Sequence, residues 1–373
     1  MLPFFTEYYG NPSSVYNFAQ KSKMAIEDAR EIIADSIGAA KSNEIYFTGG
    51  GSESDNWALK SAAFGLRDKG NHIITTKIEH HAILNTCAYL EKNGFEVTYL
   101  DVDSEGFVSL EDVENAITEK TILISVMFAN NEIGTIEPVC EIGEIAHKHG
   151  ILFHTDAVQA MCHVPINVTE MNIDLLSASA HKFHGPKGVG FMYMKNSAKL
   201  EPFIHGGAQE RARRAGTSNV PGIVGMGQAV KLALSTLDKD THTIINMRNY
   251  IVDRILGEIP DVTFDGPCID ANAVSAGSPA GSLKRLPSNM HFCFKDVSGD
   301  SLLIMLDMNG ICASSGSACA AGSIDPSHVL LAIGRSKGET KGALRLSIDK
   351  DLTKEDADYA IDALKAAVAR LRR

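Results

Sequence analysis

The sequence has no CxxC pair, and its seven cysteines are an odd number. A disulfide framework and a zinc site are therefore not expected, and a reduced, cytoplasmic setting is favoured. No stretch approaches the roughly 20 apolar residues that a membrane-spanning helix needs, and the first residues do not have the pattern of a secretory signal. An excess of basic residues is also lacking. The formal net charge of −11 argues against general nucleic-acid binding.

A chain of 373 residues is too long for one compact core, so two domains are predicted. From about residue 43 to 195, short apolar runs alternate with segments of helical periodicity. Such repeated strand–helix units predict an α/β fold, in which helices cover both faces of a doubly wound, mostly parallel sheet. The predicted strands lie at 44–48, 72–76, 96–103, 121–128, 151–156, 173–179 and 188–194.

The pattern changes near residue 238. A long helix at 241–259 is followed by predicted strands at 262–264, 288–294, 310–314 and 343–348, which is typical of a smaller α+β domain. We therefore predict a large domain over 1–238 and a small C-terminal domain over 239–373. Residues 270–282 are rich in small side chains and are predicted to form an exposed insertion.

Three consecutive glycines follow the first strand, in "GGGSES". Glycines let the backbone approach a ligand closely, and the amide groups at the start of the next helix bind anions. The segment lacks the lysine of a nucleotide-binding P-loop, and its spacing is not GxGxxG, so a phosphate site of another kind is favoured. The alternative is a helix start in which Ser52 is the N-cap and Glu53 lies near the positive end of the helix dipole.

Two charged residues follow later strands. Asp156 ends the run "ILFHTD", and Lys182 lies in "AHKFHGPKG" after another strand. In open α/β sheets, ligands bind outside the carboxyl ends of the strands. The neighbours of Lys182 indicate partial burial, which would lower its pKa and make it a nucleophile toward carbonyls. Alternatively, Asp156 caps a turn and Lys182 is a surface residue; Lys187 is interpreted as an exposed turn residue.

A phosphate site, a carboxylate at a strand end and a nucleophilic lysine together indicate pyridoxal phosphate. That cofactor needs a lysine for its Schiff base, a carboxylate for its pyridinium nitrogen and an anion site for its phosphate.

Cys319 lies in "SSGSACAAGS", a run of small residues that follows neither a helical nor a strand period. The run predicts a loop that carries a thiol, whereas most cysteines behave as small hydrophobic residues inside regular elements.

Five motifs, in this order along the chain, resemble those of the cysteine desulfurases, which are class V, fold-type I pyridoxal-phosphate enzymes. They are "NNEIGT", "FHTDAVQ", "SASAHKFHGPKGVGF", "GGAQERARRAGTSN" and "SSGSACAAG", and the resemblance covers nearly the whole chain. It implies a large cofactor-binding domain, a smaller domain that carries the cysteine loop, and a homodimer.

The resemblance also implies roles for individual residues. Lys182 matches the lysine that binds the cofactor covalently, Asp156 the partner of the pyridinium nitrogen, and Cys319 the catalytic thiol. The remaining matches concern the cofactor and the substrate. They are His80, rather than His81, for stacking on the ring; Gln159 for the phenolic oxygen; Asn131 near cofactor and substrate; Gly51, Ser52, Ser179 and His181 for cofactor and phosphate contacts; Thr217 for a phosphate contact with the partner subunit; and Arg345 for the substrate carboxylate.

The reaction implied is the conversion of L-cysteine to L-alanine, with the sulfur left as a persulfide on Cys319 and passed to an acceptor protein such as an iron–sulfur scaffold. Selenocysteine lyase, cysteine-sulfinate lyase and a weakly active homologue remain alternatives. The family has a strand and an "N-A-A-T-T" loop before the segment that matches Met1 to Phe5. Without them, we expect a more open substrate pocket and slower turnover.

Overall fold

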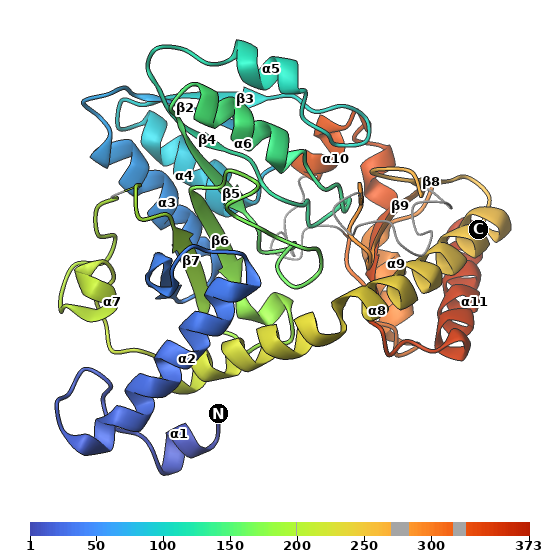
Figure 1. The fold of residues 1–373 in the computed structure, drawn as a ribbon. Helices are drawn as coiled ribbons and strands as arrows, with labels where there is room; N and C mark the ends of the chain where they lie inside the picture. Colours follow the sequence, from blue (N-terminus) through green and yellow to red (C-terminus); the bar gives the residue numbers. More distant parts are fainter. Residues whose placement is uncertain (199, 270–282, 316–325) are drawn as a thin grey trace. The chain divides into compact units, whose positions relative to one another are not determined.

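The computed structural model describes residues 1–198, 200–269, 283–315 and 326–373, which form two compact units (Figure 1). The first contains Met1–Leu100, Leu110–Phe128 and Pro138–Leu237, and the second contains Asp101–Ser109, Ala129–Glu137 and Asp238–Arg373. Two short segments from the first half of the chain thus belong to the second unit, which the sequence pattern did not indicate. The domain boundary at residue 238 stays a prediction, and the insertion predicted at 270–282 lies outside the described residues.

A seven-stranded sheet forms the centre of the first unit, in the order β1-β7-β6-β5-β4-β2-β3. All neighbouring strands are parallel except β7, which is antiparallel to both β1 and β6. The predicted α/β fold with a mostly parallel sheet is confirmed. The strands are β1 (Ile45–Thr48), β2 (His72–Thr76), β3 (Glu96–Leu100), β4 (Thr121–Ser125), β5 (Leu152–Asp156), β6 (Leu175–Ser179) and β7 (Gly190–Met194).

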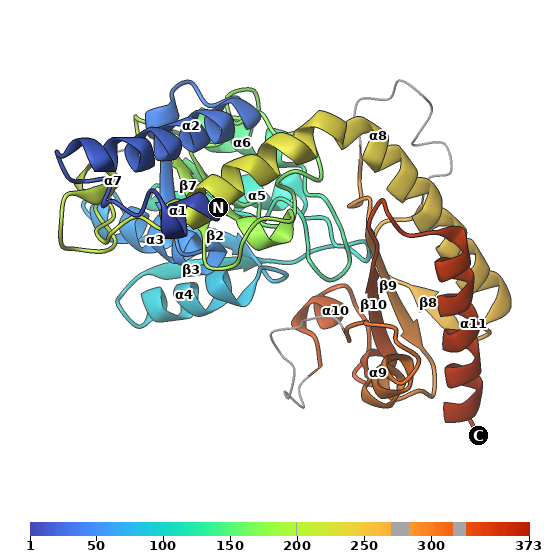
Figure 2. The same ribbon diagram turned by 90° about the horizontal axis from the view of Figure 1, so that it is seen from below.

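Helices cover both faces of this sheet, with α3 and α4 on one side and α2 and α6 on the other (Figure 2). This arrangement explains why β4, β6 and β7 are buried along their whole length. The single tryptophan, Trp57 on α3, is fully buried in the core. The helices are α1 (Pro3–Thr6), α2 (Gln20–Ser36), α3 (Gly51–Gly65), α4 (His81–Glu91), α5 (Leu110–Asn115), α6 (Val139–Lys148) and α7 (Gln209–Ala212), with 3-10 turns at Asn17–Ala19, Ser42–Glu44 and Ala180–Lys182.

The second unit contains a three-stranded antiparallel sheet in the order β10-β9-β8. Alternation along β9 gives this sheet two different faces. Phe292 and Phe294 enter the hydrophobic core, whereas His291 and its neighbour across the ladder, Arg345, share the opposite face. The elements are β8 (Val262–Phe264), β9 (Asn289–Phe294), β10 (Ala343–Ser347), α9 (Gly299–Asp307), α10 (His328–Ala332), α11 (Lys354–Leu371) and a 3-10 turn at Glu339–Gly342.

The strand predicted at 310–314 does not form. These residues have no ladder, and only Ser314 forms an isolated bridge, with Arg345. The prediction was wrong because small residues here provide neither the alternation nor the bulk that a strand needs to pack on a sheet.

Helix α8 (Val220–Glu258) is 39 residues long and begins well before the helix predicted at 241–259. By length and composition alone it could cross a membrane, contrary to the expectation from the sequence, although a core helix of a soluble protein passes the same test. Its buried side chains include Met226 and Val230 in the first unit and Ile251 and Ile255 in the second. The helix therefore contributes to the packing of both units.

Candidate active site

The sheet order brings the end of β1 close to the end of β6. Gly190, the first residue of β7, pairs with Thr48 on one side and with Ser179 on the other. Both partners are the last residues of their strands, so the segments that follow them start at the same edge of the sheet. One segment is the glycine run at 49–51, and the other is the turn from Ala180 to Lys182.

The glycine run leads directly into α3, whose N-cap is Gly50 rather than Ser52. Gly50 has φ 149°, and no side chain caps the helix. A Cβ atom at Gly51 would lie 2.6 Å from Cγ2 of Val158, so the backbone is too close to its neighbour for a larger residue. The amide groups at the start of this helix of 15 residues have no side-chain cap, which is the arrangement that the predicted anion site requires.

The alternative role of Ser52 as the N-cap is therefore wrong, whereas Glu53 does lie in the first turn of α3, near the positive end of the helix dipole. Ser52 lies inside the first turn of α3, and Glu53 accepts a hydrogen bond from the amide of Gly49 at 2.8 Å. Glu53 also pairs with Arg214 at 2.8 Å. This ion pair ties the segment that carries Thr217 to the start of α3, while Thr217 itself is exposed on this chain.

Ser179 and His181 complete the polar edge beside the glycine run. The hydroxyl of Ser179 lies 2.9 Å from Nδ1 of His181, and the same hydroxyl is near the backbone of Gly50. Burial and the charges of Lys182 and Lys187 lower the pKa of His181. These effects favour the neutral form of the His181 ring.

Asp156 is the last residue of β5, and its carboxyl is buried. Burial raises the pKa of Asp156 to about 6, although the amide of Val158, at 2.9 Å from Oδ1, and the charge of Lys182 both favour the ionised form. A cation placed against this carboxyl would ionise it fully. Gln159 follows in the next turn and is half-buried.

Lys182 ends the 3-10 turn after β6 and is exposed, so the partial burial expected for it is wrong. The turn Ala180–Lys182 directs only Ala180 into the core. Lys182 nevertheless lies close enough to Asp156 for its charge to lower the pKa of that carboxyl.

His80 lies beside Asp156. A ring nitrogen of His80 and carboxylate oxygens of Asp55 and Asp156 are all within 4.8 Å of one another. Nδ1 of His80 also accepts a hydrogen bond from the amide of Ala82 at 3.1 Å, so the ring caps α4 as well. The ring centroid of His81 is 6.4 Å from that of His80, and both histidines line a pocket of about 410 Å³ together with Ser52.

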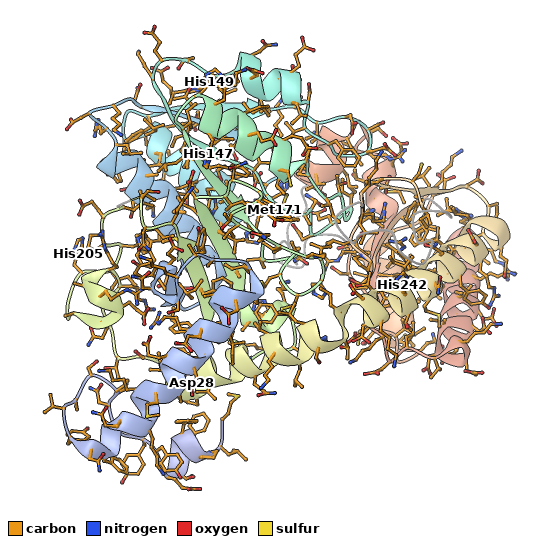
Figure 3. All side chains as sticks on the ribbon, viewed as in Figure 1. Asp28, His147, His149, Met171, His205 and His242 are labelled. Atoms are coloured by element: carbon orange, nitrogen blue, oxygen red, sulfur yellow. The ribbon has the colours of Figure 1, made fainter. Side chains whose placement is uncertain are left out.

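Other histidines of the first unit have different partners. His147 on α6 lies 3.1 Å from Asp174, and His149, just after α6, lies 3.4 Å from Glu114. Figure 3 shows both near α6, and His205 beside α7. His147 and His149 therefore pair with other carboxylates, whereas His80 lies beside Asp55 and Asp156.

In the second unit the structure brings together Arg345, Asn131 and the start of the cysteine loop. Nη1 of Arg345 donates a hydrogen bond to the carbonyl oxygen of Asn131 at 2.9 Å. The backbone of Arg345 also pairs with Ser314, the first residue of "SSGSAC". Cys319 lies outside the described residues.

Sequence reasoning missed three buried polar residues next to Asp156, namely Asp55, His154 and Ser177. The place of Asp55 on α3, three positions after Ser52 in the segment that follows the glycine run, was the available sequence indication for it. His154 is in the quoted motif "FHTDAVQ" but was not singled out.

The residues of the first unit fit pyridoxal phosphate. The uncapped start of α3 with Ser179 and His181 suits a phosphate, and the buried carboxyl of Asp156 suits a pyridinium nitrogen. Lys182 is close enough for its charge to lower the pKa of the Asp156 carboxyl.

Comparison with known proteins agrees with this fit. Residues 1–360 match the family described as "Aminotransferase class-V". The chain is 54% identical to "Cysteine desulfurase IscS" of Clostridium botulinum strain Hall, over 100% of this chain and 90% of the relative. It is 51% identical to "Cysteine desulfurase IscS" of Methanosarcina thermophila, over 100% and 88%.

Solved structures are similar as well. A "NIFS-LIKE PROTEIN" superposes with a TM-score of 0.89 at 36% identity, covering 99% of this chain and 94% of the other. "SspA in complex with cysteine" superposes with a TM-score of 0.78 at 38% identity, covering 93% of each chain. The chain therefore belongs to the class-V aminotransferase family and, within it, to the cysteine desulfurases.

Proposed function

We propose that this protein is a pyridoxal-phosphate-dependent cysteine desulfurase, which converts L-cysteine to L-alanine and leaves the sulfur as a persulfide on Cys319. The observation that carries the proposal is the convergence of the uncapped start of α3, the buried carboxyl of Asp156 and the lysine after β6 at one edge of the sheet. When bound, pyridoxal phosphate supplies the electron sink for bond changes at the substrate Cα and Cβ.

Residues of the first unit would bind the cofactor and move protons. Gly51, Ser52, Ser179 and His181 would bind the phosphate group, together with Thr217 contributed across a homodimer. Asp156 would keep the ring nitrogen protonated, His80 would stack on the ring, and Gln159 would contact the phenolic oxygen. Lys182 would bind the cofactor covalently and then transfer the proton of the substrate Cα.

Residues of the second unit would bind the substrate and take its sulfur. Arg345, positioned by the carbonyl oxygen of Asn131, would bind the substrate carboxylate. The Cys319 thiolate would attack Sγ of L-cysteine, so that an S–S bond forms as the Cβ–S bond breaks. The electron pair of the broken bond stays on Cβ, which takes up a proton to give alanine.

The persulfide then passes to a sulfur-acceptor protein, for which an iron–sulfur scaffold is the proposed class. We place the enzyme in the cytoplasm, where thiols such as Cys319 stay reduced.

Cys319→Ala tests the activity itself. The variant should bind pyridoxal phosphate like the parent but should form no persulfide from L-cysteine, because no thiol remains in the loop to accept sulfur. Sulfide and alanine release would be measured at equal cofactor occupancy, with Cys312→Ala as the matched control, since Cys312 is exposed and close in sequence. Parental rates in Cys319→Ala would refute the proposed role of the thiol.

The assignment of Lys182 is tested by borohydride reduction, which fixes the bound cofactor onto the amine that holds it. Mass spectrometry of the digested parent should find the reduced adduct on Lys182. Lys182→Ala should lose it, and Lys187→Ala, a change at the neighbouring lysine of the same loop, should keep it. An adduct on Lys187 would overturn the assignment.

Arg345→Lys should raise the KM for L-cysteine by about 10- to 150-fold while leaving the absorption of the bound cofactor unchanged, because lysine keeps the charge but loses a bidentate bond worth about 1.5–3 kcal/mol. Initial rates over a range of cysteine concentrations would measure the effect. Arg254→Lys is the control, since Arg254 pairs with Glu258 and Asp358 in the same unit. An unchanged KM in Arg345→Lys would exclude the carboxylate role.

The raised pKa of Asp156 predicts how stability depends on pH. In the folded protein this carboxyl titrates near 6, against 3.8 for the ordinary group, so the folded state binds more protons between these values and stability falls as pH rises through them. Asp156→Asn removes this loss. The cofactor-free variant should gain stability over the parent as pH rises from 4 to 7, by up to about 3 kcal/mol.

Urea unfolding of both cofactor-free proteins across this pH range would measure the difference. The same variant should bind pyridoxal phosphate more weakly than the parent. A difference in stability that does not change with pH would show that Asp156 is not the buried group that titrates.

A further inference from the structure

Asp55 points from α3 into the sheet and is 1% exposed. It lies over three consecutive strands of the sheet, whose polar side chains form one connected group. Nδ1 of His154 on β5 lies 2.9 Å from Oγ of Ser125 on β4, and its Nε2 lies 3.0 Å from Oγ of Ser177 on β6. Oδ1 of Asp55 lies 3.8 Å from the same Nε2. Asp55 is thus fixed within a buried polar network.

This network lies directly against Asp156. His154 and Asp156 are two residues apart on β5 and share a face of the sheet, and Ser177 is the partner of Asp156 in the ladder with β6. Carboxylate oxygens of Asp55 and Asp156 lie within 4.8 Å of each other and of a ring nitrogen of His80. Two buried carboxyls therefore face the place proposed for the ring nitrogen of the cofactor.

The surroundings of Asp55 oppose a negative charge on it. Among the described residues no lysine or arginine pairs with Asp55, and its Oδ1 accepts no hydrogen bond. Burial, then the charge of Asp156 and that of Glu79, hold the pKa of Asp55 well above its usual range, while a hydrogen bond from Ser177 acts in the opposite direction. His154 does not supply a positive charge, because burial lowers its pKa to about 3.

Lys182 provides the positive charge that acts on Asp156, and it favours the ionised form of that carboxyl. The surroundings of the two carboxyls thus favour different charge states. Asp156 is the one that a neighbouring cation ionises, and Asp55 is the one that burial keeps neutral.

We infer that Asp55 is a positioning residue that holds a proton behind Asp156, so that the two carboxyls together present one negative charge to the ring nitrogen of the cofactor. A single pyridinium neutralises a single carboxylate, and a second carboxylate at this depth would remain uncompensated. The inference rests on the proposed function, because it assigns Asp156 to that nitrogen.

The proton on Asp55 can be tested without the cofactor. Infrared spectra of the cofactor-free parent and of Asp55→Asn would be compared at neutral pH. The parent should show the carbonyl stretch of a protonated carboxylic acid that the variant lacks. A difference spectrum that shows only the loss of an ionised carboxylate would overturn the inference.

The positioning role is tested with pyridoxal phosphate that is isotope-labelled at the ring nitrogen, whose NMR shift reports protonation. Asp55→Asn keeps a neutral hydrogen-bonding group, so its cofactor Kd should stay within about twofold of the parent and the ring nitrogen should stay protonated. Asp55→Ala should weaken cofactor binding about tenfold and reduce protonation of the ring nitrogen, whereas Asp55→Asn should keep both near the parental level. Asp156→Asn is the control for loss of the charge.

Two results would refute the role. Asp55→Asn behaving like Asp156→Asn would show that Asp55 acts as a charged carboxylate. Asp55→Ala losing thermal stability while keeping the parental Kd and ring protonation would show a merely structural residue. Failure of the parent to bind pyridoxal phosphate would instead refute the proposed function, and the infrared comparison would still decide whether Asp55 is protonated.

Discussion

The burial of the Asp156 carboxyl at the end of β5 is the constraint on which the rest of the candidate site depends. Taking a carboxylate out of water is unfavourable, and a backbone amide and the nearby charge of Lys182 offset only part of that cost. The position is therefore poorly suited to a cofactor-free protein and well suited to one that binds a cation there. A site that is strained when empty and relieved when occupied is a common feature of binding sites.

The candidate site also requires that the backbone at Gly50, at Gly190 and at Ala178 come close together, and this approach depends on β7. Because β7 is antiparallel to both β1 and β6, those two strands are parallel to each other, and their carboxyl ends lie at one edge. Gly190 permits this approach: a Cβ atom there would lie 2.4 Å from the carbonyl oxygen of Ala178 and 2.8 Å from Cα of Gly50. The proposed anion site thus depends on a glycine that belongs neither to the glycine run nor to the lysine turn.

In the second unit, one strand residue organises the groups proposed to bind the substrate. The side chain of Arg345 reaches the carbonyl oxygen of Asn131, and its backbone pairs with Ser314. The residue proposed to bind the substrate carboxylate thus also anchors the start of the loop that carries the proposed thiol.

The class of fold and the cofactor chemistry could be predicted from the residues alone. Alternating apolar runs specify buried strands, and the residue types at their ends, glycine, aspartate and lysine, indicate a cofactor, because these properties are local in the chain. Which groups meet, and which of them favour the charged form, depends instead on how separate elements pack. Four features depend on contacts between residues distant in the chain. They are the proximity of Asp55 to Asp156, the exposure of Lys182, the place of 101–109 and 129–137 in the second unit, and the missing strand at 310–314. A sequence pattern reports which face of an element is apolar, whereas burial and the distances between charges arise only when separate elements pack together.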